Sequence, residues 1–530
     1  MELNEQALKQ KKFWQEKQIL LPVFDRALVK EKSEREPVWL HFGPGNIFRA
    51  FIAKLQQQLL DMGEAKHGII AVAPNSRTII DQVYAPFDNL SLLVTMYPDG
   101  TMQKEVIASI TEAVALVPAT ADWQRLETVI AAPTLQILSF TITEKGYTVK
   151  DAQGNLLAPV AADAALGPTM AQSFFGKLTA LLVHRFNAGA FPVTLLSLDN
   201  CSHNGDLLQA AVITMAQAWS EHGFVPAAFV DYARNKITYP WSMIDKITPR
   251  PAPEVQAALQ AEGLNDMKIT TSARGGYYAP FVNAESTGYL VIEDHFSNGR
   301  PPLEKAGVIF TNRQTVEKVE RMKVSTCLNP LHTTLAVYGC LFGYTLIAAE
   351  MQDKELSKLV TCIGEEAMQV VEDPKVLSPH AFLQECLTKR FPNKAIPDTP
   401  QRIACDTSKK MGPRFGGTIK AFGPAASGLK FIPLALAGWC RYLLAIDDRG
   451  KPMELSPDPL LPQLTKALQG IKLGDTTVNV HLHLKDILSS ERIFGSNLYA
   501  TSLGTKVEEY FAEMLQGPGA VRRTLQKYLS

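Results

Sequence analysis

The chain has 530 residues, of which 46% are hydrophobic and 20% are charged, and its 53 basic and 53 acidic side chains cancel. This composition is typical of a globular protein of two or three domains, and it provides no basic patch for nucleic acid. The sequence contains no run of 18 apolar residues, so no membrane span is predicted. The charged stretch 1–21 predicts a short amphipathic helix rather than a signal peptide. Seven cysteines without CxxC spacing are typical of reduced thiols. We therefore expect a cytoplasmic protein with no nucleic-acid or membrane partner.

The stretch from residue 37 to residue 62 predicts a strand, a tight glycine turn and a helix. An apolar run at 38–42 meets Gly43, Pro44 and Gly45, and an apolar-periodic segment follows. This order is typical of the opening of a dinucleotide-binding unit. Gly43 permits the sharp turn, Gly45 lets the backbone approach a pyrophosphate, and the helix N-terminus offers its N–H groups to phosphate. Phe48 stands where the fingerprint has its third glycine, so a plain β-turn explains the two glycines about as well.

A second strand is predicted at residues 67–74, and it ends at Asn75, Ser76 and Arg77. A NAD site normally has Asp or Glu here to bind the ribose hydroxyls, whereas an arginine tolerates the 2′-phosphate of NADP. Arg77 is equally well explained as a solvated loop residue. The sequence therefore leaves both NAD and NADP open as cofactors.

Alternating strands and helices continue to residue 198 and predict a mostly parallel sheet covered on both faces. The expected strands are 92–97, 135–142 and 193–198, and the expected helices between them include 124–131 and 172–186. Polar clusters at 141–147 and 198–205 close two of these strands. Ligands of open α/β sheets bind at the carboxyl ends of strands, so both clusters indicate a site, although ordinary turn and N-cap chemistry explains each cluster alone.

A Gly/Pro-rich turn after a strand within 289–303 places a domain boundary near residue 305. From residue 315 the pattern becomes helical, most clearly at 332–351, 354–372, 431–445 and 506–516. The predicted fold class is α/β: a Rossmann-like dinucleotide-binding domain at 1–305 and a mostly α-helical domain at 306–530. Residues 478–487 predict a strand, on which His481 and His483 share one face. Polar alternation explains this pair better than a metal site.

The segment 323–332, KVSTCLNPLH, concentrates candidate chemistry in ten residues. Lysine can transfer a proton when burial lowers its pKa, so Lys323 is a candidate acid/base. Asn329 can donate hydrogen bonds to a substrate oxygen, and His332 can hold a hydroxyl. The alternative is an ordinary helix start, with Asn329 as N-cap, Pro330 at the first helical position and His332 in the core.

Motifs in a recognisable order run along almost the whole chain. They are HFGPGNIFRA (41–50), TITEKGY (141–147), SLDNCSHNG (197–205), SMIDKITP (242–249), YLVIEDHF (289–296), MKVSTCLNPLH (322–332), RIACDTSKKMGPR (402–414) and GWCRYLLAIDDRGKP (438–452). Together they resemble the polyol-specific long-chain dehydrogenases, a family that includes mannitol dehydrogenase, fructuronate reductase (mannonate oxidoreductase) and tagaturonate reductase. The resemblance implies metal-independent hydride transfer between NAD(H) and a secondary alcohol or ketone.

The resemblance also implies roles for individual residues. Lys323 matches the general acid/base, Asn200 and Asn329 match the oxyanion hole, and Glu320 matches a proton relay to solvent. Four further residues match substrate contacts of the family: His332, Asp245 and the pair Arg402 and Lys410, which are eight residues apart. The cofactor turn corresponds to Gly43, Gly45, Asn46, Ile47, Phe48 and Arg49. No metal ligand is implied.

One departure from the family pattern concerns spacing. The family places the asparagine five and the histidine eight residues after the lysine, whereas Asn329 and His332 follow Lys323 by six and nine. On a regular helix, eight residues return close to the starting face and nine land near the opposite one. We therefore predict a π-bulge or an irregular turn between Lys323 and Asn329, with a helix starting at Asn329.

The expected substrate is an open-chain sugar acid or polyol. Arg402, Lys409, Lys410 and Arg414 form a cationic cluster suited to a carboxylate, although a solvated basic loop is the alternative. D-fructuronate, reduced to D-mannonate, is the first choice, and the alternatives are a tagaturonate reductase or a mannitol 2-dehydrogenase. A hypothesis of another class is a non-catalytic nicotinamide-binding redox sensor. The chain is expected to be a monomer or small homo-oligomer.

Overall fold

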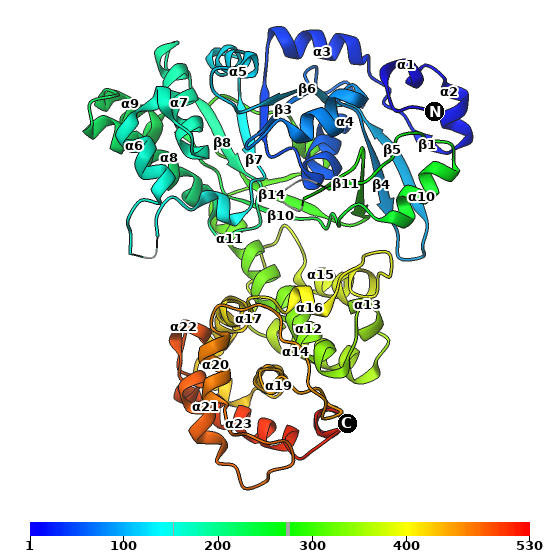
Figure 1. The fold of residues 1–530 in the computed structure, drawn as a ribbon, viewed down its shortest axis with the longest axis vertical. Coiled ribbons are helices and arrows are strands. Elements are labelled where there is room, and N and C mark those ends of the chain that lie inside the picture. Colours follow the sequence, from blue (N-terminus) through cyan, green and yellow to red (C-terminus); the bar gives the residue numbers. More distant parts are fainter. Residues whose placement is uncertain (152, 272–275) are drawn as a thin grey trace. The chain divides into compact units, whose positions relative to one another are not determined.

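The computed structural model describes residues 1–151, 153–271 and 276–530, which divide into two compact units (Figure 1). The first unit contains residues 1–97 and 101–317, and the second contains residues 98–100 and 318–530. Strand β15 (Ile309–Thr311) pairs in parallel with β14 (Tyr289–Glu293), so the first unit continues past residue 305. Within the described ranges, every helix is too short or too polar to cross a bilayer.

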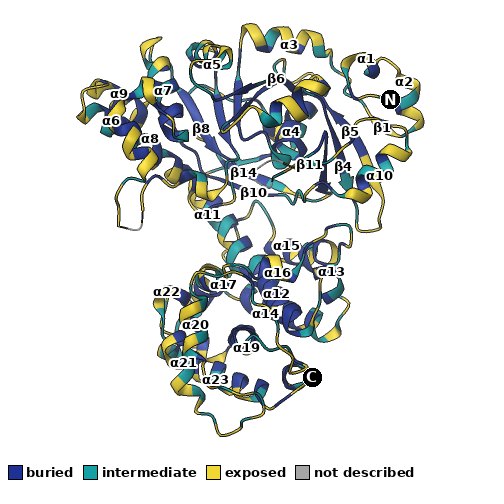
Figure 2. Cartoon of the chain, in the orientation of Figure 1, coloured by how far each residue is buried: buried dark blue, intermediate teal, exposed yellow. Residues whose placement is uncertain are grey.

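A six-stranded sheet forms the centre of the first unit, in the order β6-β3-β2-β7-β8-β9, and all its pairings are parallel. Its strands are β2 (Trp39–Phe42), β3 (Ile69–Ala73), β6 (Ile110–Ala115), β7 (Ile137–Phe140), β8 (Val193–Ser197) and β9 (Ile237–Thr238). The predicted parallel sheet is confirmed. Every residue of β2, β3, β7 and β8 is buried, as expected for strands covered on both faces (Figure 2).

Successive side chains of a strand point to opposite faces, and β2 shows how this divides the core. Leu40 and Phe42 join the apolar cluster that packs against α5, α7 and α8, whereas Trp39 joins the cluster on the other face, against α4. These helices are α4 (Ala53–Asp61), α5 (Ala121–Ala131), α7 (Phe174–Asn187) and α8 (Asn204–Glu221). Burying one such large apolar side chain contributes roughly 1.5–3 kcal/mol, so both faces stabilise the sheet.

One predicted strand lies in a different sheet. The run 92–97 forms β4 (Ser91–Met96), which belongs to a four-stranded sheet of order β1-β5-β4-β13 and not to the parallel one. It pairs antiparallel with β5 (Met102–Ile107), because a short connection through Gly100 (φ +86°) turns the chain back directly. Its assignment to the parallel sheet was wrong: an apolar run does not reveal its partner. The other strands of the first unit are β1 (Ile19–Leu20), β10 (Ser242–Asp245), β11 (Thr270–Thr271), β12 (Tyr277–Tyr278) and β13 (Phe281–Glu285).

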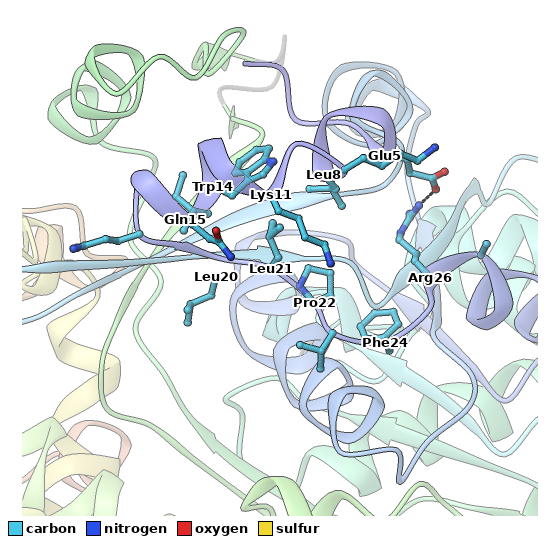
Figure 3. Close-up of a pocket in the computed structure, with 15 residues that line it drawn as sticks. Glu5, Leu8, Lys11, Trp14, Gln15, Leu20, Leu21, Pro22, Phe24 and Arg26 are labelled. Carbon is cyan, nitrogen blue, oxygen red and sulfur yellow. Dashed lines mark ion pairs between the residues drawn. The ribbon is translucent and has the colours of Figure 1, made fainter.

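The N-terminal segment is broken into α1 (Glu5–Leu8), α2 (Lys11–Glu16) and β1, where the sequence predicted one amphipathic helix. The indole of Trp14 is fully buried and donates from Nε1 to the carbonyl of Ala7 at 2.8 Å, which fixes the two helices together. Figure 3 shows a pocket of about 750 Å³ beside this segment. Its walls are mostly apolar and contain none of the candidate site residues.

Further helices of the first unit complete its described part, apart from short 3-10 turns and a second π-helical turn, η2 (Ile80–Tyr84). They are α3 (Arg26–Arg35), α6 (Ala158–Leu166), α9 (Ala227–Asn235), α10 (Pro253–Ala261), α11 (Arg313–Arg321), which runs on into the second unit, and the π-helical turn η1 (Phe48–Ile52). The second unit is helical, as predicted. Its longer helices are α12 (Asn329–Phe342), α14 (Lys354–Met368), α15 (Pro379–Glu385), α19 (Phe431–Tyr442), α20 (Leu461–Ala467), α21 (Val480–Leu488), α23 (Leu503–Met514) and α24 (Ala520–Leu529).

Helices α12 and α19 form the centre of the second unit. They approach closely at Gly438, where a Cβ atom would overlap the ring of Tyr338. The helix predicted at 332–351 is interrupted at Gly343 (φ +79°), after which α13 (Ile347–Glu350) begins. The strand predicted at 478–487 is wrong, because this segment forms α21.

The misassigned segment buries Leu484, Ile487 and Leu488. Because these three side chains share one face of a helix, their burial favours a helix over a strand. The two histidines consequently diverge. Nδ1 of His481 contacts Glu508 at 2.8 Å, and Nδ1 of His483 contacts the carbonyl of Ala467 at 2.9 Å.

Gly43→Ala is expected to lower the free energy of unfolding by at least about 3 kcal/mol, because Gly43 has φ +101° and a Cβ atom there would overlap the carbonyl of Thr141. Gly45→Ala is the matched control, since no atom lies within 4 Å of its Cβ position. Urea unfolding of both variants measures the difference. Equal stability of the two variants would contradict the close approach of the turn to β7.

Candidate active site

The glycine turn after β2 is built as a phosphate-binding turn requires. Gly43 passes so close to the end of β7 that a side chain is excluded, while open space surrounds the Cβ position of Gly45. The hydroxyl of Tyr84 donates to the carbonyl of Pro44 at 2.8 Å and holds the turn in place. Helical backbone begins at Asn46, so the N–H groups of the first turn lie directly after the glycines.

Two of the residues expected in the cofactor turn lie inside the core. Phe48 and Arg49 are both 0% exposed. The ring of Phe48 stacks on the imidazole of His41 with centroids 4.1 Å apart, in the place where the usual fingerprint has glycine. Arg49 donates to the carbonyl of Ala279 at 2.7 Å and to Oδ1 of Asn46 at 3.0 Å, so it fixes the first residue of the helix. Burial lowers the pKa of its guanidinium.

The polar clusters at the ends of β7 and β8 are joined by one carboxylate. Asp199 accepts hydrogen bonds from the backbone N–H groups of Ile142 (2.8 Å) and Thr143 (3.0 Å) and from the hydroxyl of Tyr147 (2.7 Å). Asn200, the next residue, is exposed, and its side chain makes no hydrogen bond within the described chain. The structure therefore separates a structural aspartate from an asparagine that is free to bind a ligand.

Asn204 is the second structural residue of this cluster. Its buried amide donates to the carbonyl of Ser242 at 3.0 Å and accepts from the N–H of Ser242 at 3.0 Å, which ties the loop after β8 to the start of β10. Asp245 is the last residue of β10 and is 3% exposed. It is paired across the sheet with Tyr289 of β14.

In the second unit, the predicted irregularity after Lys323 is present. A π-helical turn, η7 (Met322–Cys327), separates α11 from α12, and the N–H of Leu328 donates to the carbonyl of Lys323 at 3.2 Å, an i→i+5 bond. Leu328 then leaves helical geometry (φ −121°, ψ −62°), and α12 begins at Asn329. Both the predicted π-bulge between Lys323 and Asn329 and the predicted helix start at Asn329 are therefore confirmed.

Neighbouring segments hold this wide turn in place. The hydroxyl of Ser325 donates to the carbonyl of Pro413 at 3.0 Å, and the hydroxyl of Thr418 donates to the carbonyl of Ser325 at 2.7 Å. Pro413 lies in a second π-helical turn, η9 (Gly412–Gly416). Lys323 is 3% exposed, so its side chain is held within the protein rather than solvated. Glu320 lies one turn earlier in α11 and is partly exposed.

His332 contacts a buried carboxylate, a pairing that the sequence did not indicate. Its Nε2 lies 2.8 Å from Oδ2 of Asp398, and the guanidinium of Arg402 contacts the other oxygen of the same carboxylate. The histidine and the arginine hold the pKa of Asp398 below its usual value, although burial opposes them. The signal was present but weak, because Asp398 precedes Arg402 by four residues, a spacing typical of helical ion pairs.

Two further cations lie beside this group. Arg414 contacts the hydroxyl of Thr333 and the carbonyl of Asn329 (3.5 Å), and burial lowers its pKa to about 10. Lys410 donates to the carbonyl of Ile403 at 2.9 Å, and burial, followed by repulsion from Arg414, lowers its pKa to about 8. Lys409 and Arg402 are both exposed, but only Arg402 of the two contacts Asp398. The predicted cluster therefore contracts to Arg402, Lys410 and Arg414.

The second unit therefore brings together Asn329, His332, Arg402 and Lys410, and it adds Asp398 and Arg414. Asn200, Asp245 and the glycine turn belong to the first unit. Within the described ranges, no group of three or more His, Cys, Asp or Glu side chains is arranged to hold a metal ion.

A parallel sheet with a glycine turn, followed by a helical unit with a buried lysine, defines a two-domain dehydrogenase. The chain belongs to the mannitol dehydrogenase family. The mannitol dehydrogenase Rossmann domain matches residues 38–305, and the mannitol dehydrogenase C-terminal domain matches residues 315–512.

Relatives and solved structures support the same assignment. The chain is 48% identical to a D-mannonate oxidoreductase of Thermotoga maritima over 99% of both chains. It is 30% identical to a mannitol 2-dehydrogenase of Cereibacter sphaeroides, over 88% of this chain and 95% of that protein. The ternary complex of Pseudomonas fluorescens mannitol 2-dehydrogenase with NAD and D-mannitol matches with a TM-score of 0.75 at 27% identity, over 100% of this chain and 99% of that chain.

Asn204→Ala is expected to destabilise the first unit by about 2–4 kcal/mol, because it leaves the buried N–H and carbonyl of Ser242 without partners. Asn200→Ala is the matched comparison and should change stability by less than about 0.5 kcal/mol, since this side chain is exposed. Thermal unfolding of the two variants tests this division. A larger loss for Asn200→Ala would contradict it.

Proposed function

We propose that this protein is a NAD-dependent oxidoreductase that reduces the ketone of an open-chain hexuronate, with D-fructuronate converted to D-mannonate as the first choice. The observation that carries the proposal is the excess of positive charge at Arg402, Lys410 and Arg414, where the carboxylates named near them among the described residues are Asp398, which contacts Arg402, and Asp406, which attracts Lys410. The 48% identity to a D-mannonate oxidoreductase over nearly the whole chain supports the same substrate.

The charge imbalance favours an anionic substrate over a neutral polyol. Burial lowers the pKa values of both Lys410 and Arg414, and repulsion from Arg414 adds to the effect on Lys410, so the charged forms of the two side chains are destabilised in this protein. A carboxylate offsets both effects by pairing with the two side chains. A neutral sugar alcohol supplies no such compensation. Tagaturonate satisfies the same charge requirement and remains an alternative substrate, whereas mannitol fits it less well.

The residues of the first unit fit a nicotinamide dinucleotide. Gly43 brings the turn against β7, Gly45 leaves open space for a pyrophosphate, and the N–H groups that follow face it. Bound NADH would supply the hydride. Arg77 is paired with Asp81 at 3.0 Å and with Asp122, so its charge is already compensated. This favours NAD over NADP, whose 2′-phosphate requires an available cation.

The proposed chemistry follows from the charge that develops on the ketone oxygen. Asn200 and Asn329 would donate amide hydrogen bonds to that oxygen, each stabilising the transition state by roughly 3 kcal/mol. Lys323 would give its proton to the oxygen, and Glu320 would return a proton to the lysine from solvent. His332 and Asp245 would hold the neighbouring hydroxyls. No step requires a metal ion.

Lys323→Ala is expected to lower the rate of D-fructuronate reduction by roughly 10²–10⁴-fold, since this is the usual contribution of general acid catalysis. The matched control is Lys318→Ala in α11, whose ammonium pairs with Glu372 at 3.4 Å. NADH absorbance measures both variants. Retention of more than about a tenth of the parent rate by Lys323→Ala removes lysine from this role.

A pH dependence follows from Lys410, whose pKa is lowered to about 8. The protonated amine attracts a carboxylate, so kcat/KM for the uronate should be highest below this pKa and should fall as pH rises through it. Lys410→Arg should move the fall to higher pH, and Lys410→Met should lower kcat/KM by roughly 10–100-fold at pH 7. Lys409→Met, at the exposed neighbour, is the control. An unchanged profile in Lys410→Arg would contradict a role for this amine.

A substrate panel of fructuronate, tagaturonate and fructose separates the alternatives. The proposal expects the highest kcat/KM with fructuronate and the lowest with fructose. Faster turnover of fructose or mannitol would identify a polyol dehydrogenase. Turnover with none of them would favour a non-catalytic nicotinamide-binding sensor.

A further inference from the structure

The carboxylate of Asp398 occupies a defined place behind His332. The backbone of Asp398 is fixed on both sides, because its N–H donates to the carbonyl of Ile396 at 2.8 Å and its carbonyl accepts from the N–H of Ile347 at 3.0 Å. Its Oδ2 lies 2.8 Å from Nε2 of His332. The ring of Phe391 stacks beside the imidazole with centroids 5.6 Å apart, so the imidazole has little freedom to rotate.

We propose that Asp398 is a positioning residue of the reaction: it accepts the Nε2 hydrogen of His332 and so leaves Nδ1 as a hydrogen-bond acceptor for a substrate hydroxyl. The role of His332 toward substrate rests on the proposed function. The link between Asp398 and the imidazole does not, since it follows from the 2.8 Å contact between Oδ2 and Nε2 alone.

The charges around the imidazole determine which nitrogen carries the hydrogen. Burial lowers the pKa of His332, and Arg402 and Arg414 add to this effect, while Asp398 opposes it. The lowered pKa favours the neutral imidazole, which carries one N–H. An ionised carboxylate can only accept a hydrogen bond, so that N–H must be at Nε2. Nδ1 has no hydrogen-bond partner within the described residues and keeps its lone pair.

A second carboxyl group near Asp398 does not disturb this arrangement. Glu350 is 0% exposed, and neither of its oxygens has a hydrogen-bond partner among the described residues. Burial, followed by repulsion from Asp398, raises its pKa to about 9. Glu350 is therefore neutral near pH 7. Asp398 is thus the carboxylate that, within the described ranges, contacts both His332 and Arg402.

Asp398→Asn tests the proposal because the substitution preserves shape but can reverse the tautomer. Arg402 contacts the other oxygen of this carboxylate, and in the variant it would hold the amide oxygen. The amide NH₂ would then face Nε2, which must accept, and the hydrogen would move to Nδ1. We expect kcat/KM for D-fructuronate to fall by about 100-fold or more, by the precedent of a wrong histidine tautomer in acid–base catalysis.

Two readouts separate positioning from a structural effect. Nitrogen chemical shifts of ¹⁵N-histidine-labelled protein report the tautomer, with His332→Asn used to assign the signal. In the parent we expect the Nε2–H form, and in Asp398→Asn the Nδ1–H form. In a His332→Asn background, Asp398→Asn should cause no more than about a threefold further loss of kcat/KM, because its effect passes through the imidazole.

Asp448→Asn is the matched control. Asp448 is also a buried carboxylate of the second unit, but it accepts from the N–H groups of Val521 (2.9 Å) and Arg522 (3.3 Å) at the start of α24. This variant should lose thermal stability without a change in the His332 tautomer.

The proposal is overturned by an Nδ1–H tautomer in the parent, by an unchanged tautomer in Asp398→Asn, or by an equal loss of kcat/KM with and without His332. The parent tautomer decides the matter even if Asp398→Asn does not fold. Absence of uronate turnover in the parent would instead remove the proposed function and leave the tautomer measurement valid.

Discussion

The i→i+5 hydrogen bond between the carbonyl of Lys323 and the N–H of Leu328 is the constraint on which the candidate site depends. A regular helix through this segment would place Lys323 and His332 nearly opposite each other, because nine residues rotate the helix by about two and a half turns. The π-helical turn contains one residue more than a regular helical turn between hydrogen-bonded groups. Hydrogen bonds between Ser325, Pro413 and Thr418 secure it, so the irregularity is a built feature rather than a frayed end.

The second organising feature is an unequal balance of charge. Arg402, Lys410 and Arg414 lie near one another and are accompanied by the carboxylate of Asp398, while Glu350 behind it is neutral. Such a balance is costly in the absence of a ligand, because like charges repel and because Lys410 and Arg414 lose hydration on burial, although Arg402 stays exposed. An anionic substrate relieves the cost. The proposed preference for a sugar acid over a neutral polyol thus has an electrostatic basis in addition to the similarity to a D-mannonate oxidoreductase.

Much of the fold could be predicted because strands buried on both faces leave continuous apolar runs, as β3 and β8 do. The π-turn could be predicted because a spacing mismatch of one residue has few structural solutions. The packing partners of individual strands and helices were harder to predict from the sequence. The run at β4 carried no sign of its antiparallel neighbour, and alternating polarity at 478–487 concealed the helical face of α21.

Contacts within the candidate site were equally hard to predict from the sequence. Asp398 and His332 are 66 positions apart in the sequence, and nothing in the pattern joins them. In the polar cluster after β8, the resemblance singled out Asn200, but the residue types alone did not show that Asp199 and Asn204 are structural, and their hydrogen bonds reveal it. A sequence therefore shows which residue types are present, whereas the contacts that distinguish a structural residue from a ligand-binding one are seen only in the structure.

The most direct measurement of the central claim is the transfer of deuterium from NADH deuterated at C4 to D-fructuronate, with both C4 stereoisomers of the label used and the product observed by NMR. The account predicts that one of the two stereoisomers places a single deuteron on the carbon that was the ketone, with D-mannonate as the product and no exchange with water. Deuterium lost to solvent, or no labelled product from either stereoisomer, would contradict direct hydride transfer to a uronate ketone.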